Sequence, residues 1–263
     1  MLIDSHTHLD HCEEEVAALI SDAWEAGVGL IIQSGIDLER SRYSVRLAER
    51  FPEIFATVGI HPEEAGNADD RQMAGIEELL AHPRVIAVGE TGLDFYHDNW
   101  PRDLQEEVFI RHIELARRAG LPVVIHTRDA ADRTLATLAD HAQGLTVILH
   151  CFSLPDHLDE VIDRGYYVSF AGNVTYKKAV ELQAAAVAVP DHLLMLETDA
   201  PWLTPVPLRG RPNRPGLVAL TYEFVAGLRK VEVDRLAAQV ELNVRRAFPR
   251  LAERLAEQGR AVR

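Results

Sequence analysis

The chain has 263 residues, of which 47% are hydrophobic, and a formal net charge of −14. The length fits two small domains or one large α/β domain, and the acidic charge argues against a protein that holds nucleic acid through a broad basic surface. No hydrophobic stretch is long enough to span a bilayer, and the first residues do not resemble a signal peptide. Because Cys12 and Cys151 are the only cysteines, we expect a cytoplasmic protein without a disulfide framework.

Short runs rich in Val, Ile and Leu alternate along the chain with segments of helical periodicity. Runs of this length are typical of parallel strands that are buried on both faces. Helical spacing is clearest from Asp103 to Ala119, and it is also present from Val16 to Gly27 and from Leu38 to Arg50. The predicted strands are Leu2–Ile3, Val28–Ile32, Ile54–Val58, Val85–Val88, Val123–Ile125, Val147–Leu149, Tyr166–Phe170 and Leu193–Leu196.

Eightfold alternation of strand and helix predicts an α/β fold of the (β/α)8 TIM-barrel type, with residues 1–263 forming a single domain. A doubly wound sheet is the alternative, but that fold usually has a glycine-rich loop after its first strand, where this chain has His6-Thr7-His8. A loop rich in proline and arginine, from Pro201 to Pro215, follows the last predicted strand. The segment from Val233 to Ala256 is predicted to be a C-terminal helix that packs against the barrel.

Six side chains that can bind a metal ion follow predicted strands. Each one alone has an ordinary explanation, such as a solvated histidine, a core histidine or a carboxylate in an ion pair. In a parallel barrel, however, the carboxyl ends of the strands meet on one face, so distant segments can supply one site. Together these side chains predict a single metal centre made by His6, His8, Glu90, His126, His150 and Asp199.

The predicted ligands divide into two adjoining groups, which favours two divalent ions. His6 and His8 alternate on an extended strand and point the same way, and the eighth strand brings Asp199 beside them. Imidazole and carboxylate suit Zn²⁺, Mn²⁺, Co²⁺ or Ni²⁺, and Mg²⁺ less well. Such a centre keeps a net positive charge, which suits hydrolysis of an anionic phosphate ester by metal-activated water. Asp199 and Glu90 are the candidate catalytic residues, with Asp199 orienting the water or accepting its proton.

Six motifs occur in the following order: DSHTHLD at 4–10, GIHP at 59–62, GETGLD at 89–94, HTRDA at 126–130, HCFS at 150–153 and ETDAP at 197–201. Their combination closely resembles the TatD-type metal-dependent deoxyribonucleases of the amidohydrolase-like superfamily, across essentially the whole chain. The resemblance implies a (β/α)8 barrel that hydrolyses DNA phosphodiesters, as an exonuclease. It also implies one metal held by His6, His8, Glu90 and Asp199, and a second held by Glu90, His126 and His150.

The chain departs from the family pattern in two places. Leu154 stands where a glycine usually follows the HCFS motif, and Leu208 and Arg214 replace the usual His and Glu of the loop after the eighth strand. Neither departure changes a predicted metal ligand. Both bear on substrate contacts and therefore on the preferred substrate.

Five residues are candidates for substrate binding. His61 could reach a phosphate or be an ordinary histidine at the barrel rim. Arg128 could hold a phosphate bidentately or form an ion pair with Asp129 or Glu90. Arg209, Arg211 and Arg214 could guide a nucleic-acid backbone or lie in a solvated loop.

Two aromatic residues near the predicted site have a similar pair of interpretations. Trp202 and Phe152 could stack on a nucleobase, or they could pack among other side chains around the barrel mouth. We expect a monomer that takes DNA as its substrate, in single-stranded form or at 3' ends, and has no membrane partner.

Two other functions fit the predicted metal centre. The first is an amidohydrolase or an esterase that deacylates aminoacyl-tRNA, although dinuclear amidohydrolases commonly have a bridging lysine on the fourth strand, where this chain has Glu90. The second is a non-catalytic, metal-stabilised scaffold that binds nucleic acid or protein. A structural zinc site normally closes with four ligands, so six ligands beside a cationic loop favour an open catalytic centre.

Overall fold

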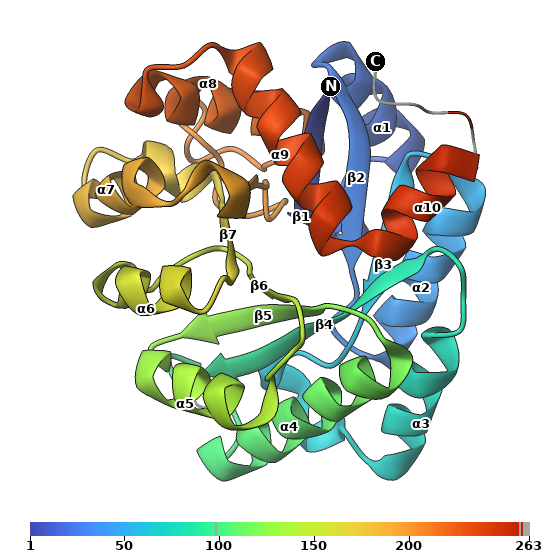
Figure 1. The fold of residues 1–263 in the computed structure, drawn as a ribbon. Helices are drawn as coiled ribbons and strands as arrows, with labels where there is room; N and C mark the ends of the chain where they lie inside the picture. The colour runs from blue at the N-terminus through green and yellow to red at the C-terminus, as the bar shows by residue number, and fades with distance from the viewer. Residues whose placement is uncertain (98, 258, 260–263) are drawn as a thin grey trace. The chain divides into compact units, whose positions relative to one another are not determined.

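The computed structural model describes residues 1–97, 99–257 and 259. Its eight strands follow one another in the sheet in chain order, and the pairs with a defined register are parallel. Helices connect these strands, which is the predicted (β/α)8 barrel topology. The strands are β1 (Leu2–Thr7), β2 (Val28–Ser34), β3 (Ile54–Val58), β4 (Val85–Asp94), β5 (Val123–Arg128), β6 (Val147–Leu149), β7 (Tyr167–Phe170) and β8 (Leu194–Leu196) (Figure 1).

The α-helices occupy the connections between strands and the C-terminal segment. In the described part of the chain, no helix has both the length and the apolar character that a bilayer crossing requires. The helices are α1 (Val16–Glu25), α2 (Leu38–Arg50), α3 (Asp70–Leu79), α4 (Arg102–Ala119), α5 (Ala131–His141), α6 (Leu158–Asp163), α7 (Val180–Ala188), α8 (Val218–Arg229), α9 (Val233–Ala247) and α10 (Pro249–Glu257).

The first of two compact units consists of Met1–Gln33 and Leu149–Asn243. In this unit α8 packs against β1 and β8. Tyr222 of α8 is fully buried, and its hydroxyl donates to the Ile3 carbonyl at 3.1 Å and accepts from the Ile3 amide at 3.3 Å. A buried phenol needs such partners, so α8 fixes the position of β1 through polar contacts as well as through packing.

The second unit consists of Ser34–Ile148 and the segment that begins at Val244. Here α2 packs along β3 and α4 along β4 (Figure 1). Gly92 of β4 lies opposite His126 of β5, and its φ of +142° favours glycine. A Cβ atom at Gly92 would lie 2.0 Å from the His126 carbonyl oxygen. The close approach of β4 to β5 therefore depends on a residue without a side chain.

The predicted strand ends were too early in the segments that carry polar site residues. β3 and β6 have the predicted bounds, but β4 continues to Asp94, so Glu90 lies inside the strand and not beyond its end. His6 and His126 likewise lie inside β1 and β5. The hydrophobic pattern stops before the hydrogen-bonded ladder does because these last side chains face polar surroundings instead of the core.

The C-terminal segment also differs from the prediction of one helix over Val233–Ala256. It forms two helices, α9 and α10, with Phe248 between them. Pro249 has no amide hydrogen with which to continue α9, but it is well suited to the first turn of a new helix. The division is therefore encoded locally by this proline.

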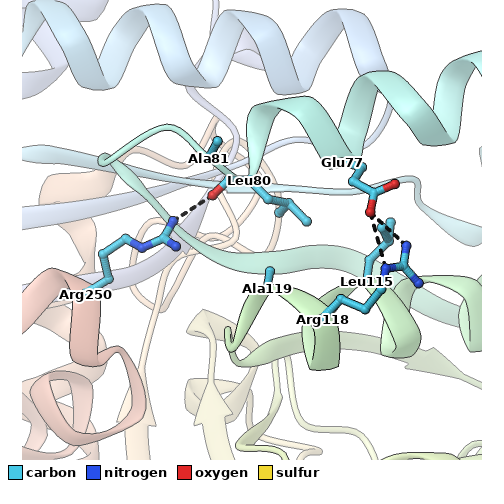
Figure 2. A pocket seen from close by; sticks show the side chains of 7 residues that line it. All are labelled: Glu77, Leu80, Ala81, Leu115, Arg118, Ala119 and Arg250. Atoms are coloured by element: carbon cyan, nitrogen blue, oxygen red, sulfur yellow. Dashed lines mark hydrogen bonds and ion pairs between the residues drawn. The ribbon is translucent and has the colours of Figure 1, made fainter.

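A groove of about 290 Å³ lies in the second unit, beside α10 (Figure 2). Arg250 reaches from α10 and donates to the carbonyl oxygens of Leu80 at 2.8 Å and Val85 at 2.7 Å. Val85 begins β4, so this groove lies at the opposite end of the strand from Asp94. That end of a barrel serves stability more than catalysis. The lining residues are Glu77, Leu80, Ala81, Leu115, Arg118, Ala119 and Arg250.

Candidate metal centre

Each unit contains a cluster of imidazole and carboxylate groups whose ligand atoms lie within 4.8 Å of one another. In the first unit the group is His6, His8 and Asp199, named here the His6 cluster. In the second unit one such group is His61, Glu90 and His126, named the Glu90 cluster, and a second is Glu63, Asp94 and His97. Of the six residues in the His6 and Glu90 clusters, five were predicted as metal ligands, and His61 was predicted as a substrate contact.

The geometry of the His6 cluster follows from the end of β1. His6 and His8 are alternate residues, so their side chains point to the same side. Their Nε2 atoms are 3.1 Å apart, and they lie 3.9 Å and 3.5 Å from Oδ1 of Asp199. The Asp199 amide donates to the His6 carbonyl oxygen at 3.0 Å, which ties the segment after β8 to β1. Asp199 has a φ of 54°, a left-handed conformation that aspartate tolerates better than most residues.

His150, which directly follows β6, lies beside the His6 cluster. Its ring stacks on the His6 ring, with centroids 3.9 Å apart and an interplanar angle of 18°. Glu197 is fully buried, and its Oε1 accepts the Cys151 amide at 2.7 Å and lies 3.3 Å from His150 Nδ1. A carboxylate at Nδ1 orients an imidazole and leaves Nε2 available for a metal ion. Glu197 is therefore a positioning residue that the sequence reasoning missed.

The pKa values of two aspartates in the first unit, the half-buried Asp199 and the buried Asp4, are shifted in opposite directions. Burial opposes ionisation of Asp199, but the hydrogen bond from His8 and the charge of His150 outweigh it, so the pKa of Asp199 is lowered. Burial raises the pKa of Asp4 well above its usual value, even though Asp4 accepts hydrogen bonds from the Thr198 amide and hydroxyl. Asp199 is thus the carboxylate suited to a cation, whereas Asp4 connects β1 to the segment that carries Asp199.

The Glu90 cluster lies where β3, β4 and β5 approach their carboxyl ends. Oε1 of Glu90 is 2.9 Å from His126 Nδ1 and 3.4 Å from His61 Nε2. His61 Nδ1 accepts the Glu63 amide at 3.2 Å, so the proton of a neutral His61 is on Nε2 and faces Glu90. Burial, together with the charge of His126, lowers the pKa of His61.

Asp94 extends the Glu90 cluster and was not predicted as a site residue. Its Oδ2 lies 3.1 Å from His126 Nε2 and 3.0 Å from His97 Nδ1. Burial opposes ionisation of Asp94, but hydrogen bonds from His126 and His97 outweigh it, so the pKa of Asp94 is lowered. The spacing contained a signal, because Glu90 and Asp94 are four residues apart on one strand and therefore share a face.

Of the four arginines predicted as possible substrate contacts, Arg128, Arg209 and Arg211 are exposed, whereas Arg214 is half-buried. The Arg128 guanidinium lies 3.8 Å from the centre of the Tyr96 ring, and that of Arg209 lies 4.3 Å from the centre of the Tyr176 ring. Stacking on an aromatic ring leaves the edge of a guanidinium open to an anion. Arg211 is on the same loop as Arg209.

Residues that depart from the family pattern have structural partners. Arg214 forms ion pairs with Glu14 at 3.1 Å and Asp22 at 3.2 Å, which tie the loop after β8 to α1 and the segment before it. Leu154 is buried. Phe152 is also buried, with its ring centroid 5.7 Å from that of Phe170, so packing and not base stacking is the correct interpretation for it.

The donor atoms of both clusters fit divalent cations. Each cluster combines imidazole nitrogens with a carboxylate oxygen, the set that binds Zn²⁺, Mn²⁺, Co²⁺ or Ni²⁺. Parallel strands in chain order, with such clusters toward or beyond the carboxyl ends of the strands, are typical of barrel hydrolases that use metal ions.

Comparison with known proteins gives the family. The model of the family described as TatD related DNase matches residues 3–249. The chain therefore belongs to the TatD family of metal-dependent hydrolases. It is 39% identical to the "uncharacterized metal-dependent hydrolase TatD" of Mycobacterium tuberculosis, over 94% of this chain and 97% of that protein. It is 36% identical to the "3'-5' ssDNA/RNA exonuclease TatD" of Musicola paradisiaca, over 90% of this chain and 92% of that protein.

A solved relative agrees with the fold. The crystal structure of YJJV, a TatD homologue from Escherichia coli K12, superposes with a TM-score of 0.90 at 29% identity, covering 94% of this chain and 98% of that one. The prediction of a (β/α)8 barrel is thus confirmed, as is the predicted family.

Proposed function

We propose that this protein is a nuclease that hydrolyses phosphodiester bonds in single-stranded DNA, acting from the 3' end. The observation that carries the proposal is the His6 cluster, where two imidazole nitrogens and one carboxylate oxygen lie within 4.8 Å of one another at the end of β1. Relatives named as 3'-5' ssDNA/RNA exonucleases, at 30% to 36% identity, support the choice of substrate and polarity.

The proposal includes one centre for two divalent ions. His6, His8 and Asp199 would hold the first ion, and His126 and His150 the second, with Glu90 serving both. The support is topological, because these residues lie in or after β1, β4, β5, β6 and β8, and the carboxyl ends of barrel strands share one face.

The side chains of the proposed centre have separate roles. Bound divalent ions would supply a positive charge for the phosphate and lower the pKa of a water molecule. Asp199 would orient the attacking water and accept its proton, with Glu90 as the second catalytic carboxylate. His61 would contact a phosphate oxygen, while the exposed Arg128, Arg209 and Arg211 would contact the sugar–phosphate backbone.

The test uses purified protein stripped of metal and then supplied with Mg²⁺, Mn²⁺ or Zn²⁺. We expect loss of one nucleotide at a time from an oligonucleotide labelled at its 5' end, and no turnover under chelation. Asp199→Asn should lower kcat by about 10²-fold to 10⁴-fold, the usual contribution of a positioned acid or base. His192→Gln, a change at an exposed histidine, is the matched control. Full activity in the chelated protein, or in Asp199→Asn, would refute the proposal.

Metal analysis on the same samples tests the stoichiometry. Two ions per chain are expected for the wild type, and fewer than two for Glu90→Ala, because Glu90 is proposed to serve both ions. Aminoacyl-tRNA and cyclic amides are the comparison substrates. Turnover of either one without turnover of DNA would assign the centre to another bond.

A further inference from the structure

Trp202 combines exposure with a position three residues after Asp199. The residue is 47% exposed, although it contacts two imidazole rings of the same unit. Its ring centroid is 5.3 Å from that of His8, at an interplanar angle of 67°, and 5.2 Å from that of His11, at 47°. We propose that Trp202, flanked by His11, is a stacking platform for a nucleobase of a single-stranded oligonucleotide. The identification of that oligonucleotide as the substrate rests on the proposed nuclease function.

The backbone of Trp202 is held at two points. Its amide donates to the Asp199 carbonyl oxygen at 3.0 Å. Its carbonyl oxygen accepts from Nδ2 of the buried Asn213 at 2.6 Å, and the same nitrogen donates to the Thr198 carbonyl oxygen at 2.9 Å. The indole is thus attached to the segment that carries Asp199. A platform that is already ordered loses little conformational entropy when it binds a ligand.

The acidic net charge of the chain favours a nucleobase, and not a phosphate group, as the ligand of Trp202. With a formal net charge of −14, the protein gains little from general electrostatic attraction to a polyanion. Base stacking on an aromatic ring provides affinity without that attraction, and it tolerates any sequence because every base has a π-face. The contact between Trp202 and His8 places the platform directly beside the His6 cluster.

In the described part of the chain, two other exposed aromatic residues lie on other segments. Tyr96, which is 59% exposed, is in the second unit, where its ring contacts that of His97. Trp24 is 65% exposed, but it lies on α1 and serves as a matched control. Phe152, the other residue considered for stacking, is 1% exposed. Trp202 is therefore the aromatic side chain of the first unit that combines exposure with contact to a candidate metal ligand.

The experiment measures binding by metal-free protein, in chelator, to a short oligothymidylate and to the same oligomer with abasic sugars in place of its 3'-terminal nucleotides. Binding is followed by fluorescence anisotropy of a label at the 5' end. Trp202→Ala should weaken binding of the intact oligomer by about tenfold to a hundredfold, the range for one stacked base. It should leave binding of the abasic oligomer unchanged. Trp202→Phe should retain part of the affinity, and Trp24→Ala should retain all of it.

The outcomes separate the platform from the nuclease. If wild-type protein with metal degrades no oligonucleotide but the difference between intact and abasic oligomers depends on Trp202, the nuclease proposal fails and the platform stands. If wild type is active and Trp202→Ala binds the intact oligomer normally, only the platform fails. Equal weakening for intact and abasic oligomers also overturns the platform, as does a wild type that binds neither. Unchanged Zn²⁺ affinity in Trp202→Ala verifies that the His6 cluster is intact.

Discussion

His112 of α4 allows a quantitative test of how the second unit is built. Its ring is fully buried, with Nδ1 2.7 Å from the Val108 carbonyl oxygen and Nε2 accepting the Ile60 amide at 3.0 Å. Both nitrogens are therefore satisfied by the neutral ring, with its proton on Nδ1. Burial, with a smaller contribution from Arg111, lowers the pKa of His112 from 6.5 to about 4. The contact holds Ile60, the residue before His61.

The sign of the pH effect follows from proton uptake. Below pH 6.5 the unfolded chain takes up a proton at His112, while the folded protein resists protonation until about pH 4. Stability is therefore lost as the pH falls through this window. The full shift corresponds to about 3 kcal/mol of unfolding free energy. Between about pH 7.5 and pH 4.5 the loss from this residue is about 2.5 kcal/mol.

The assay is urea unfolding in chelator at several pH values for the wild type, His112→Gln and the exposed control His192→Gln. The quantity compared is the change in unfolding free energy with pH, so a lower absolute stability of His112→Gln does not matter. We expect His112→Gln to lose about 2.5 kcal/mol less than the wild type between the two pH values, and His192→Gln to follow the wild type. Parallel curves for wild type and His112→Gln would refute the reasoning, as would protonation of His112 near pH 6 in a ¹⁵N NMR titration.

Three further predictions concern single side chains. Glu197→Ala should weaken Zn²⁺ binding about tenfold to a hundredfold by releasing His150 Nδ1. Glu197→Gln keeps an acceptor oxygen and should lose less Zn²⁺ affinity. Equal Zn²⁺ affinities of the wild type and Glu197→Ala in calorimetry would count against the positioning role. Arg250→Met should lower the free energy of unfolding by about 1–3 kcal/mol in urea. The kcat/KM for DNA should be unchanged, because the carbonyl partners Leu80 and Val85 lie after α3 and at the start of β4, away from Asp94. A loss of catalysis at full stability would contradict this. Gly92→Ala should lower the free energy of unfolding by about 3 kcal/mol. The control is Gly144→Ala, which should lower it clearly less, because the φ of Gly144 is also positive but an added methyl group there would lie in open space. Equal decreases in melting temperature for the two variants would show that the β4–β5 contact is not tight.

The barrel was predictable because its strands are encoded by short hydrophobic runs. β3 and β6 have the predicted bounds, since hydrophobic residues stand at both of their ends. β4 was not predicted in full because, of its last residues from Gly89 to Asp94, only Leu93 is hydrophobic. Their extended conformation depends on pairing with β5, which brings Gly92 against His126. The pairing of β4 with β5 joins residues that are far apart in the sequence, so a local hydrophobic pattern does not predict it.

The same limit explains which site residues were missed. His6 and His8 were predicted because one strand places both of them, so local geometry was sufficient. Glu197 was not predicted as a site residue, because nothing near it in the sequence shows that its carboxylate lies beside a histidine 47 residues earlier. Asp94 meets His126 across 32 residues, although its spacing from Glu90 already places both carboxylates on one face of β4. Long-range packing brings such carboxylates beside their imidazoles.

The distribution of charged side chains is compatible with an acidic protein that acts on the proposed anionic substrate. The carboxylates Asp94, Asp199 and Glu197 each lie beside an imidazole, and Asp94 and Glu197 are buried. Arg128 and Arg209 are exposed and stacked on aromatic rings, which leaves their charge available. Under the proposed function, attraction of a polyanion would come from bound cations and a few arginines, while the exposed indole of Trp202 would stack on a base. Such a nuclease would engage one strand end briefly, as an exonuclease requires, and would not coat the DNA.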